Sequence, residues 1–392
     1  MVSTHGTALG ILGIVAAASV LCLFSWHAGA ADKPEETPDP RQAMITALSA
    51  LSPHPSLGDE ARVFDRFVGT WDCNYTFFLP DGSTKRSVGE LEFGWIIDGQ
   101  AVQDIWITYP TEAGKERGIG TSVRFFDTKS KMWRVIFVSP AYNALMTVQG
   151  GAEGDRIVLR GVDDEGAMLR WSFNDIQADS FTWRGETSHD GGKTWKLEEE
   201  HHMKRRSGGS ATAKPLAGEG ANDPRTDMIR TLRSSGPNPS LGAQAQIFDR
   251  FVGAWDLDCV LYGAKGEVSR FSGQWIFGWV LDGKVEQDVI IAGSERERRA
   301  RGTTLRFYDA RSGKWRIVWI APGSGNVAIL KGGAIRDRIV LEGVDADGQP
   351  FRWSFNDIRR DSFVWRGEIS ADGGKTWRLE QEMRLKRRNP AA

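Results

Sequence analysis

The chain has 392 residues, a formal net charge of −1 and an ordinary charged fraction of 26%. Three cysteines exclude a small scaffold held together by disulfides, and a chain of this length can bury a core without them. Sixteen Trp and nineteen Phe beside five Tyr indicate an aromatic-rich interior.

The first predicted element is an export signal. Residues 9–26 are almost wholly apolar, and Ala28-Gly29-Ala30 has the small-x-small form of a signal-peptidase site. We therefore expect residues 1–30 to be a cleaved signal peptide, 31–40 to be a spacer, and the mature protein to be periplasmic or secreted. An uncleaved membrane anchor at residues 9–26 is the alternative.

The remainder of the chain is a duplication. Phe64–Asp72 returns as Phe248–Asp256, 184 positions later, and Asp190–Trp195 returns as Asp372–Trp377, 182 positions later. A period this long indicates a repeated domain and excludes a solenoid or propeller of short units. The predicted domains are residues 41–206 and 225–388, joined by a Gly- and Ser-containing linker at 207–224.

Within each copy the pattern predicts a short amphipathic helix, at 41–51 and 225–233, followed by strands and turns. Alternating apolar residues and Asp-Gly turns mark antiparallel strands at roughly ten-residue spacing. In copy 1 the expected strands after the first are 91–97, 101–109, 120–127, 133–139, 144–150, 156–161, 168–175, 180–188 and 193–204. A meander of this length closes most simply into a barrel, so we predict an all-β fold of two tandem antiparallel up-and-down barrels, each with a short N-terminal helix.

The start of each first strand carries a family resemblance. Val68-Gly69-Thr70-Trp71 and Val252-Gly253-Ala254-Trp255 resemble the Gly-x-Trp opening of lipocalin-like (calycin superfamily) barrels. That resemblance implies a Trp that plugs one end, covered by a basic residue from the last strand. The candidates for this basic residue are Lys204, Arg205, Lys386 and Arg387. The overall pattern is most similar to a bacterial domain-of-unknown-function family in that superfamily.

A second motif, Ser188–Trp195 and its copy Ser370–Trp377, resembles the Asp-box of sialidase propellers. One box per copy is too few for a propeller, so we predict that it closes the hairpin between the last two strands. Cys73 and Cys259 share a strand face with the neighbouring Trp, which predicts two buried free thiols.

Histidines are unequally distributed between the copies. His201 and His202 have Met383 and Arg384 at the corresponding positions, which excludes a metal site shared by both copies. We therefore predict no metal and no cofactor. The alternative is haem bound in barrel 1, because similarity to nitrobindin-type ten-stranded barrels implies an iron ligand late in the chain, here His201 or His202.

Several charged residues recur in both copies, and we predict structural roles for them and no catalytic residue. The recurring carboxylates are Asp98/Asp282, Asp104/Asp288, Asp175/Asp357 and Glu186/Glu368, and the recurring arginines are Arg124/Arg306, Arg134/Arg316, Arg170/Arg352 and Arg184/Arg366. Arg184 and Glu186 lie on the strand face opposite Phe181 and Trp183, which predicts salt bridges on the outside of the barrel.

The predicted site is the aromatic interior. Its candidate ligand-binding residues are Trp95, Trp133, Trp171 and Trp183 in copy 1, and Trp279, Trp315, Trp353 and Trp365 in copy 2. Such walls suit a small hydrophobic or planar molecule, and they equally suit a solid core. We predict binding of such a molecule, or a structural role in the cell envelope.

An enzyme is the alternative to a binding protein. Tandem lipocalin-like proteins that resemble this layout include hydratases and pericyclic cyclases, which implies hydratase, isomerase or cyclase chemistry on an apolar substrate. Copy 1 is net acidic and copy 2 net basic, so we expect the barrels to pack together. The basic segment 295–301 contains interleaved glutamates and is expected to be a solvated loop, without nucleic-acid binding.

Overall fold

The computed structural model describes residues 40–208, 224–293 and 299–388. The expected leader and spacer, most of the linker and most of the basic segment 295–301 lie outside these residues. Within the described part of the chain, no helix is both long enough and apolar enough to cross a membrane.

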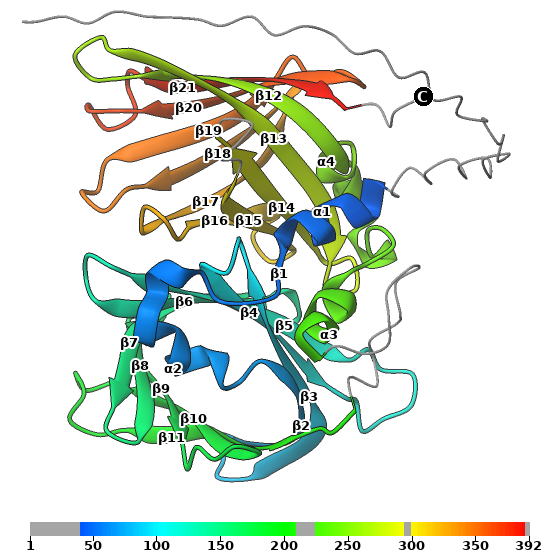
Figure 1. Ribbon diagram of the computed structural model, residues 1–392, viewed down its shortest axis with the longest axis vertical. Helices are drawn as coiled ribbons and strands as arrows, with labels where there is room; N and C mark the ends of the chain where they lie inside the picture. Colours follow the sequence, from blue (N-terminus) through cyan, green and yellow to red (C-terminus); the bar gives the residue numbers. More distant parts are fainter. Residues whose placement is uncertain (1–39, 209–223, 294–298, 389–392) are drawn as a thin grey trace, which may run out of the picture. The chain divides into compact units, whose positions relative to one another are not determined.

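Each repeat forms a closed barrel of ten antiparallel strands, in which every strand pairs with the next one along the chain (Figure 1). Barrel 1 comprises β2 (Gly69–Phe78), β3 (Thr84–Ile96), β4 (Ala101–Thr108), β5 (Gly118–Asp127), β6 (Met132–Ser139), β7 (Ala144–Glu153), β8 (Arg156–Val162), β9 (Met168–Asn174), β10 (Ser180–Ser188) and β11 (Lys196–Arg205). It closes by pairing β11 with β2.

Barrel 2 repeats this topology and closes by pairing β21 with β12. Its strands are β12 (Gly253–Tyr262), β13 (Val268–Val280), β14 (Val285–Ala292), β15 (Arg299–Asp309), β16 (Lys314–Ala321), β17 (Asn326–Ile335), β18 (Arg338–Val344), β19 (Pro350–Asn356), β20 (Ser362–Ile369) and β21 (Arg378–Arg387). The predicted all-β fold of two tandem up-and-down barrels is confirmed.

Alternation explains which strand residues enter each barrel. In β2 Trp71, Cys73 and Tyr75 are buried, whereas the intervening Asp72 and Asn74 are exposed. Strand β3 begins seven residues before its expected start at Leu91, because its first half is polar on both faces and carries no alternation. Strand β11 begins at Lys196 instead of Lys193, because the residues of the Asp-box form a turn.

A helical segment closes one end of each barrel. In barrel 1 it consists of η1 (Pro55–Ala61) and α2 (Arg62–Asp65), and in barrel 2 of η3 (Pro239–Gln244) and α4 (Ala245–Asp249). From the first segment, Phe64 packs edge-on against Trp133 at 4.8 Å between ring centroids, and Phe67 packs against Phe181 at 4.8 Å. We call this the plugged end of the barrel.

The Gly-x-Trp tryptophan belongs to the plugged end. The Trp71 indole N–H donates to the Phe67 carbonyl at 2.7 Å. The Arg205 guanidinium lies 4.1 Å from the centre of the Trp71 ring and donates to the Val68 carbonyl, and Arg387 covers Trp255 in the same way. The implied basic cover on the Trp is therefore confirmed, with Arg chosen over Lys in both copies.

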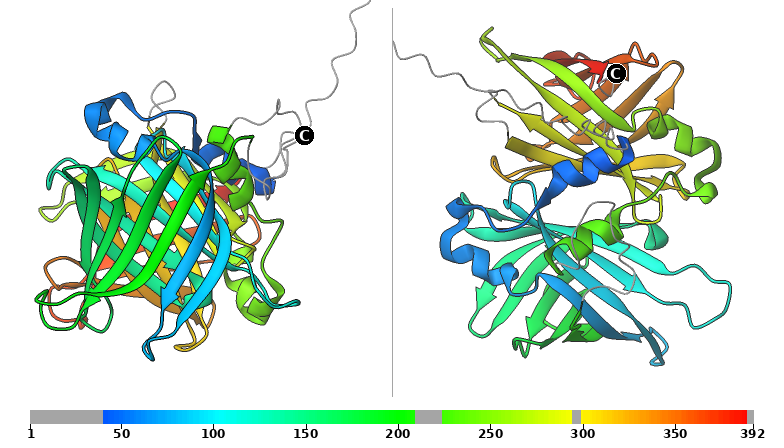
Figure 2. Two further views of the ribbon diagram at one scale, coloured as in Figure 1. Left: turned by 90° about the horizontal axis from the view of Figure 1, so that it is seen from below. Right: turned by 45° about the vertical axis from the view of Figure 1, so that its right-hand side comes forward.

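The N-terminal helices of the two repeats are exchanged. Helix α1 (Pro40–Leu48) packs on β12, β13 and β14 of barrel 2, whereas α3 (Pro224–Leu232) packs on β2, β3 and β4 of barrel 1 (Figures 1 and 2). After α1 the chain returns to its own barrel through β1 (Ser49–Ala50), which pairs with β3. The repeats therefore bury their helices reciprocally.

The barrels meet through their outer faces. Aliphatic residues of β4, β5 and β6 and of β14, β15 and β16 form one buried cluster with both exchanged helices. Within this contact Gln103 and Gln287, which occupy equivalent positions, donate to each other's side-chain oxygens at 3.2 and 3.1 Å. Asp98, one of the recurring carboxylates, accepts a hydrogen bond from the Ala300 amide of barrel 2.

Candidate functional site

The eight predicted tryptophans all point into a barrel, but they divide between its two ends. Four of them are fully buried at the plugged ends: Trp95, Trp133, Trp279 and Trp315. Trp95 donates its N–H to Asp65 at 2.8 Å, and Trp279 donates to Asp249 at 2.9 Å. These four tryptophans hold the helical segment in place and leave no face for a ligand.

Trp171 and Trp183 lie at the other end of barrel 1, with centroids 5.8 Å apart. Together with Trp106 and Phe137 they face inward yet remain half-buried. Inward-facing rings can reach solvent only where the barrel is open. We call the end lined by these four aromatic residues and His201 the open end of barrel 1.

His201 adds polar atoms to this aromatic wall. Its ring stacks on Trp183 at 4.8 Å with an interplanar angle of 21°, and it meets Tyr75 edge-on at 4.7 Å. Its Nε2 lies 3.2 Å from the Glu199 carboxylate. Glu199 therefore faces the barrel interior, on the same side of β11 as His201.

His202 points outward, where its Nδ1 lies 3.3 Å from the Thr182 hydroxyl and its Nε2 lies 3.2 Å from Glu200. A haem inside this barrel would thus take its iron ligand from His201. Binding would have to displace Glu199 from Nε2 and Trp183 from the ring face. The arrangement of these residues does not fit a haem without that rearrangement.

The interior also holds charged groups near the plugged end. In barrel 1 Arg124 donates to Asp104 at 2.5 Å, and its guanidinium lies 5.4 Å from the Phe64 ring and 5.1 Å from the Phe93 ring. The recurring Asp104 and Arg124 thus converge, but beneath the helical segment. They brace the core, and the open end lies elsewhere.

Barrel 2 buries an additional carboxylate at this place. Arg306 contacts Glu286 at 2.7 Å and Asp288 at 2.6 Å, and all three side chains are almost fully buried. Burial raises the pKa of Glu286 to about 8, with the Asp288 charge adding to the effect. Glu286 has no counterpart in barrel 1, where Val102 occupies the position.

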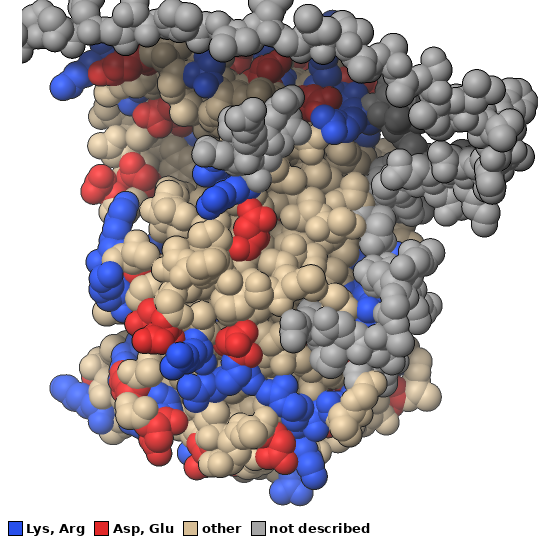
Figure 3. All heavy atoms as spheres, viewed as in Figure 1, with Lys and Arg blue, Asp and Glu red and all other residues tan. Residues whose placement is uncertain are grey.

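The predicted salt bridges on the outside of the barrel are confirmed, but Arg184 and Glu186 bond to neighbouring strands and not to each other. Arg170 donates twice to Glu186, at 2.7 Å each, and Arg184 donates to Glu200 at 2.7 Å. On the face drawn in Figure 3 the basic and acidic side chains of the described residues are interspersed, as expected for paired surface charges.

The Asp-box closes the β10–β11 hairpin as predicted. The Asp190 carboxylate accepts hydrogen bonds from the amides of Lys193 and Thr194 at 2.9 Å and from the Thr194 hydroxyl at 2.6 Å. These bonds, led by the Thr194 hydroxyl, lower the Asp190 pKa to about 2. The Trp195 ring lies 4.2 Å beneath Arg170, which ties the hairpin to β9.

Cys73 and Cys259 are buried free thiols, as predicted. Burial raises the pKa of Cys73 to about 12, so this thiol is not a nucleophile at neutral pH. Among the described residues no group of three or more His, Cys, Asp or Glu side chains is arranged to hold a metal ion.

Sequence reasoning missed Glu199 and Tyr142, which also lies at the open end of barrel 1. Tyr142 packs against Trp106 at 5.8 Å, and its hydroxyl lies beside Thr108. A signal for both residues was present in the repeat, because the corresponding positions in copy 2 are Gln381 and Ser324. The open end of barrel 1 therefore carries the ionisable groups of Glu199 and His201 where barrel 2 has Gln381 and Met383.

Comparisons with known proteins add little beyond the fold. A family model described as BNR/Asp-box repeat matches residues 186–197. No curated protein matches the chain.

Several solved structures are similar to parts of this chain, with low sequence identity and low TM-scores. Rv2717c from Mycobacterium tuberculosis is 14% identical, with 40% of this chain and 100% of that chain covered and a TM-score of 0.31. The S-type phycobiliprotein lyase CPES from Guillardia theta is 12% identical, with coverages of 37% and 92% and a TM-score of 0.29. A DUF3598 family protein of unknown function from Nostoc punctiforme is 14% identical, with coverages of 84% and 99% and a TM-score of 0.20.

Proposed function

We propose that this protein binds a small, planar and largely apolar molecule at the open end of barrel 1. One observation supports the proposal above all. The inward-facing aromatic side chains at this end remain half-buried, whereas those at the plugged end are sealed beneath α2. These aromatic faces are partly exposed to water, and covering them with a flat apolar molecule lowers the free energy of the system.

Polar groups at the same end would orient that molecule. The His201 Nε2 lies 3.2 Å from the Glu199 carboxylate, and the charge of Glu199 also acts on the Tyr142 hydroxyl. Small-molecule sites typically have a mainly apolar or aromatic wall with a small number of polar groups in it. Barrel 2 carries Met383 and Gln381 instead of the pair, so we assign specific recognition to barrel 1.

The test uses 8-anilinonaphthalene-1-sulfonate, a planar apolar probe whose fluorescence rises on binding. Replacing Trp183→Ala removes the ring that stacks on His201, and we expect the dissociation constant to rise about tenfold. The matched control is Trp365→Ala in barrel 2. Trp365 is 5% exposed and is therefore a core residue in the same strand position.

An unchanged dissociation constant in Trp183→Ala would contradict the proposal. An equal loss in Trp365→Ala would remove the assignment to barrel 1. Near-ultraviolet circular dichroism of both variants establishes that the barrels are intact. Native mass spectrometry of the protein purified from its own host would then identify the natural ligand by its mass.

We also infer that the chain is related to the bacterial domain-of-unknown-function family of the calycin superfamily. The support is the covered tryptophan, found in both copies with the same Arg geometry. This relationship concerns ancestry and the fold, and it leaves the nature of the ligand to the experiment above.

A further inference from the structure

A second concave surface lies on the outside of barrel 1, across β8, β9 and β10. It has a volume of about 190 Å³ and is lined by four arginines together with Val158, Ser172, Asn174 and Glu186. Val158, Ser172 and Asn174 are buried and form its base. We call this surface the arginine groove, and its arginines are Arg156, Arg160, Arg170 and Arg184.

The groove carries more positive charge than its carboxylates balance. Arg170 and Arg184 are held by Glu186 and Glu200, and Arg160 contacts Glu153 at 2.5 Å. Among the described residues no ion pair joins Arg156 to a carboxylate. The Arg160 pair is solvent-exposed, with 49% and 41% of its side chains accessible, so an incoming anion can replace Glu153 at little cost.

The base of the groove supplies a neutral donor. The Asn174 amide donates to the Ser172 hydroxyl oxygen at 2.9 Å, which leaves the Ser172 hydroxyl proton free to point elsewhere. Guanidinium groups bind phosphate and carboxylate oxygens in pairs, and a hydroxyl donor beside them suits the same oxygens. The groove is therefore suited to an oxyanion.

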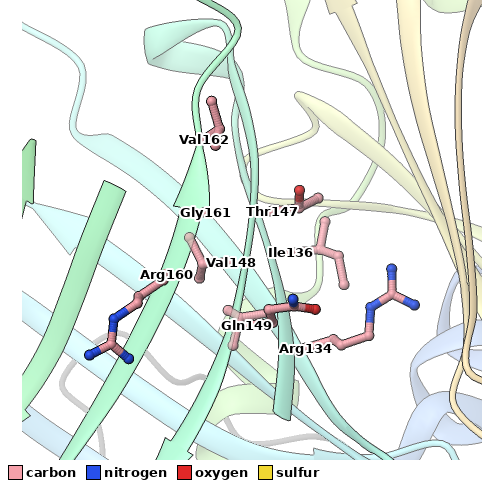
Figure 4. Close-up of a pocket in the computed structure, with 9 residues that line it drawn as sticks. Arg134, Ile136, Thr147, Val148, Gln149, Arg160, Gly161 and Val162 are labelled. Atoms are coloured by element: carbon pink, nitrogen blue, oxygen red, sulfur yellow. The ribbon is translucent and has the colours of Figure 1, made fainter. Parts of the chain in front are cut away.

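An adjoining groove extends this surface toward β6 and β7. It has a volume of about 320 Å³, shares Arg160 with the arginine groove, and is also lined by Ile136, Val148 and Val162, of which only Val162 is exposed. Val162 is 56% exposed, and its copy 2 equivalent, Val344, is 65% exposed. In Figure 4 the Arg160 guanidinium points away from Val162, so charged and apolar surfaces adjoin on opposite sides of one residue.

The second repeat provides an internal comparison. The position of Arg160 is taken by Glu342, and that of Gln149 in the adjoining groove by Lys331. The cross-strand register sets Lys331 opposite Glu342, so copy 2 places opposite charges together where copy 1 has an arginine beside an amide. The excess positive charge of the groove therefore belongs to copy 1.

We propose that the arginine groove binds an amphiphilic oxyanion, with its phosphate or carboxylate group among Arg156, Arg160 and Ser172 and a short apolar chain along Val162. This site lies on the outer surface of barrel 1, whereas the residues of the open end face the interior. It does not depend on the function proposed above.

Isothermal titration of the full-length protein at low ionic strength tests the proposal with hexyl phosphate, inorganic phosphate and hexanol. We expect hexyl phosphate to bind several-fold more tightly than inorganic phosphate, because its chain covers Val162. Hexanol should give no measurable binding. Arg160→Glu introduces the residue found in copy 2. It should weaken the binding of hexyl phosphate at least tenfold, because it replaces a cation that attracts the phosphate with a carboxylate that repels it.

The matched control is Arg338→Glu, which changes the copy 2 equivalent of Arg156 and should leave the affinity unchanged. Trp183→Ala should also leave it unchanged, which separates this site from the open end. Equal binding of hexyl phosphate by the wild-type protein and Arg160→Glu would overturn the proposal. Equal affinities for hexanol and hexyl phosphate would also overturn it. Both arginines are exposed, so these variants are expected to fold.

Discussion

Glu286 is the residue at which the two interiors differ most in charge. Barrel 2 buries two carboxylates against the single guanidinium of Arg306, whereas barrel 1 buries one carboxylate against Arg124. A buried guanidinium balances one negative charge, and a second would be left without compensation away from water. Glu286 therefore holds its proton at neutral pH, consistent with its raised pKa.

This proton makes stability depend on pH. The folded-state pKa of Glu286, about 8, lies above its ordinary value of 4.5. The folded protein therefore binds the proton more tightly than the unfolded chain, and the resulting stabilisation is lost as pH rises from about 4.5 to about 8. We expect the free energy of unfolding, measured with urea, to fall over this range by on the order of 5 kcal/mol through this group.

Glu286→Val, which reproduces the residue of barrel 1, should flatten this part of the pH profile. Val102→Leu in barrel 1 is the control, because it alters packing at the equivalent position without a titrating group. A profile as steep in Glu286→Val as in the wild-type protein would show that other groups cause the pH dependence.

The comparison of repeats missed this residue for a physical reason. The charged residues for which the sequence predicts a role are those that occur in both copies, and Glu286 occurs only in copy 2. Glu286, between Val285 and Gln287, gives no indication that Arg306 is its direct partner on the next strand, because the sequence alone does not fix the register of this hairpin.

Among the secondary-structure elements, the last hairpin of each barrel depends most on one side chain. Asp190→Ala removes the acceptor for two amides and for the hydroxyls of Ser188 and Thr194, and the turn loses its internal bonds. We expect hydrogen exchange at the Lys193 and Thr194 amides to become several-fold faster, as measured by nuclear magnetic resonance. Asp372→Ala should produce the same change at Lys375 and Thr376 and leave the first hairpin unaffected.

If Asp190→Ala left both amides as protected as before, the backbone geometry of the turn would suffice without the carboxylate. The lowered Asp190 pKa gives the same interaction a second readout. Its stabilising contribution is present above the ordinary Asp pKa and is lost as pH falls toward about 2.

Strand alternation predicted most of these elements. For the site, it predicted which residues face inward but not which end of the barrel they occupy. It identified inward-facing residues such as Trp133 and Trp183 correctly. It could not tell that Trp133 lies under α2 and Trp183 at the open end, because alternation gives the face of a strand and not the position along the barrel axis. That position follows from strand pairing and from where the helical segment enters.

At the scale of the whole molecule, the exchanged helices can be tested by a cross-link. A Cβ atom built on Gly278 of barrel 2 lies 3.2 Å from the Cβ of Met44 in α1. This separation is close to the roughly 3.8 Å found between bonded cysteines. We expect Met44→Cys with Gly278→Cys to form an intramolecular disulfide, detected by intact mass and resistance to alkylation.

The control pairs Met44→Cys with Gly94→Cys, the equivalent glycine of barrel 1. This second pair should remain reduced, because α1 does not lie on β3. Cross-linking of the control pair alone would mean that each helix stays on its own barrel. Cys73 and Cys259 do not interfere, because they are buried in different barrels, and Cys22→Ser in both variants removes the third cysteine.

The sequence predicted both helices but could not predict their exchange. The apolar faces of α1 and α3 are similar, and the outer faces of the two barrels carry equivalent aliphatic residues. Two alike helices and two alike barrels can combine in either way without a change in pattern. The choice depends on chain geometry, including how β1 returns to β3.

Because of the exchange, the outer faces of the two barrels are constrained by each other's helices, whereas the barrel interiors are not. A substitution in α1 is selected by its fit to barrel 2, and one in α3 by its fit to barrel 1, so the outer faces must change in step. The buried residues of both helices belong to the cluster between the barrels, apart from either barrel core. Each barrel interior could therefore diverge after duplication without disturbing the other. Two equivalent positions show this: His201 corresponds to Met383, and Glu286 corresponds to Val102.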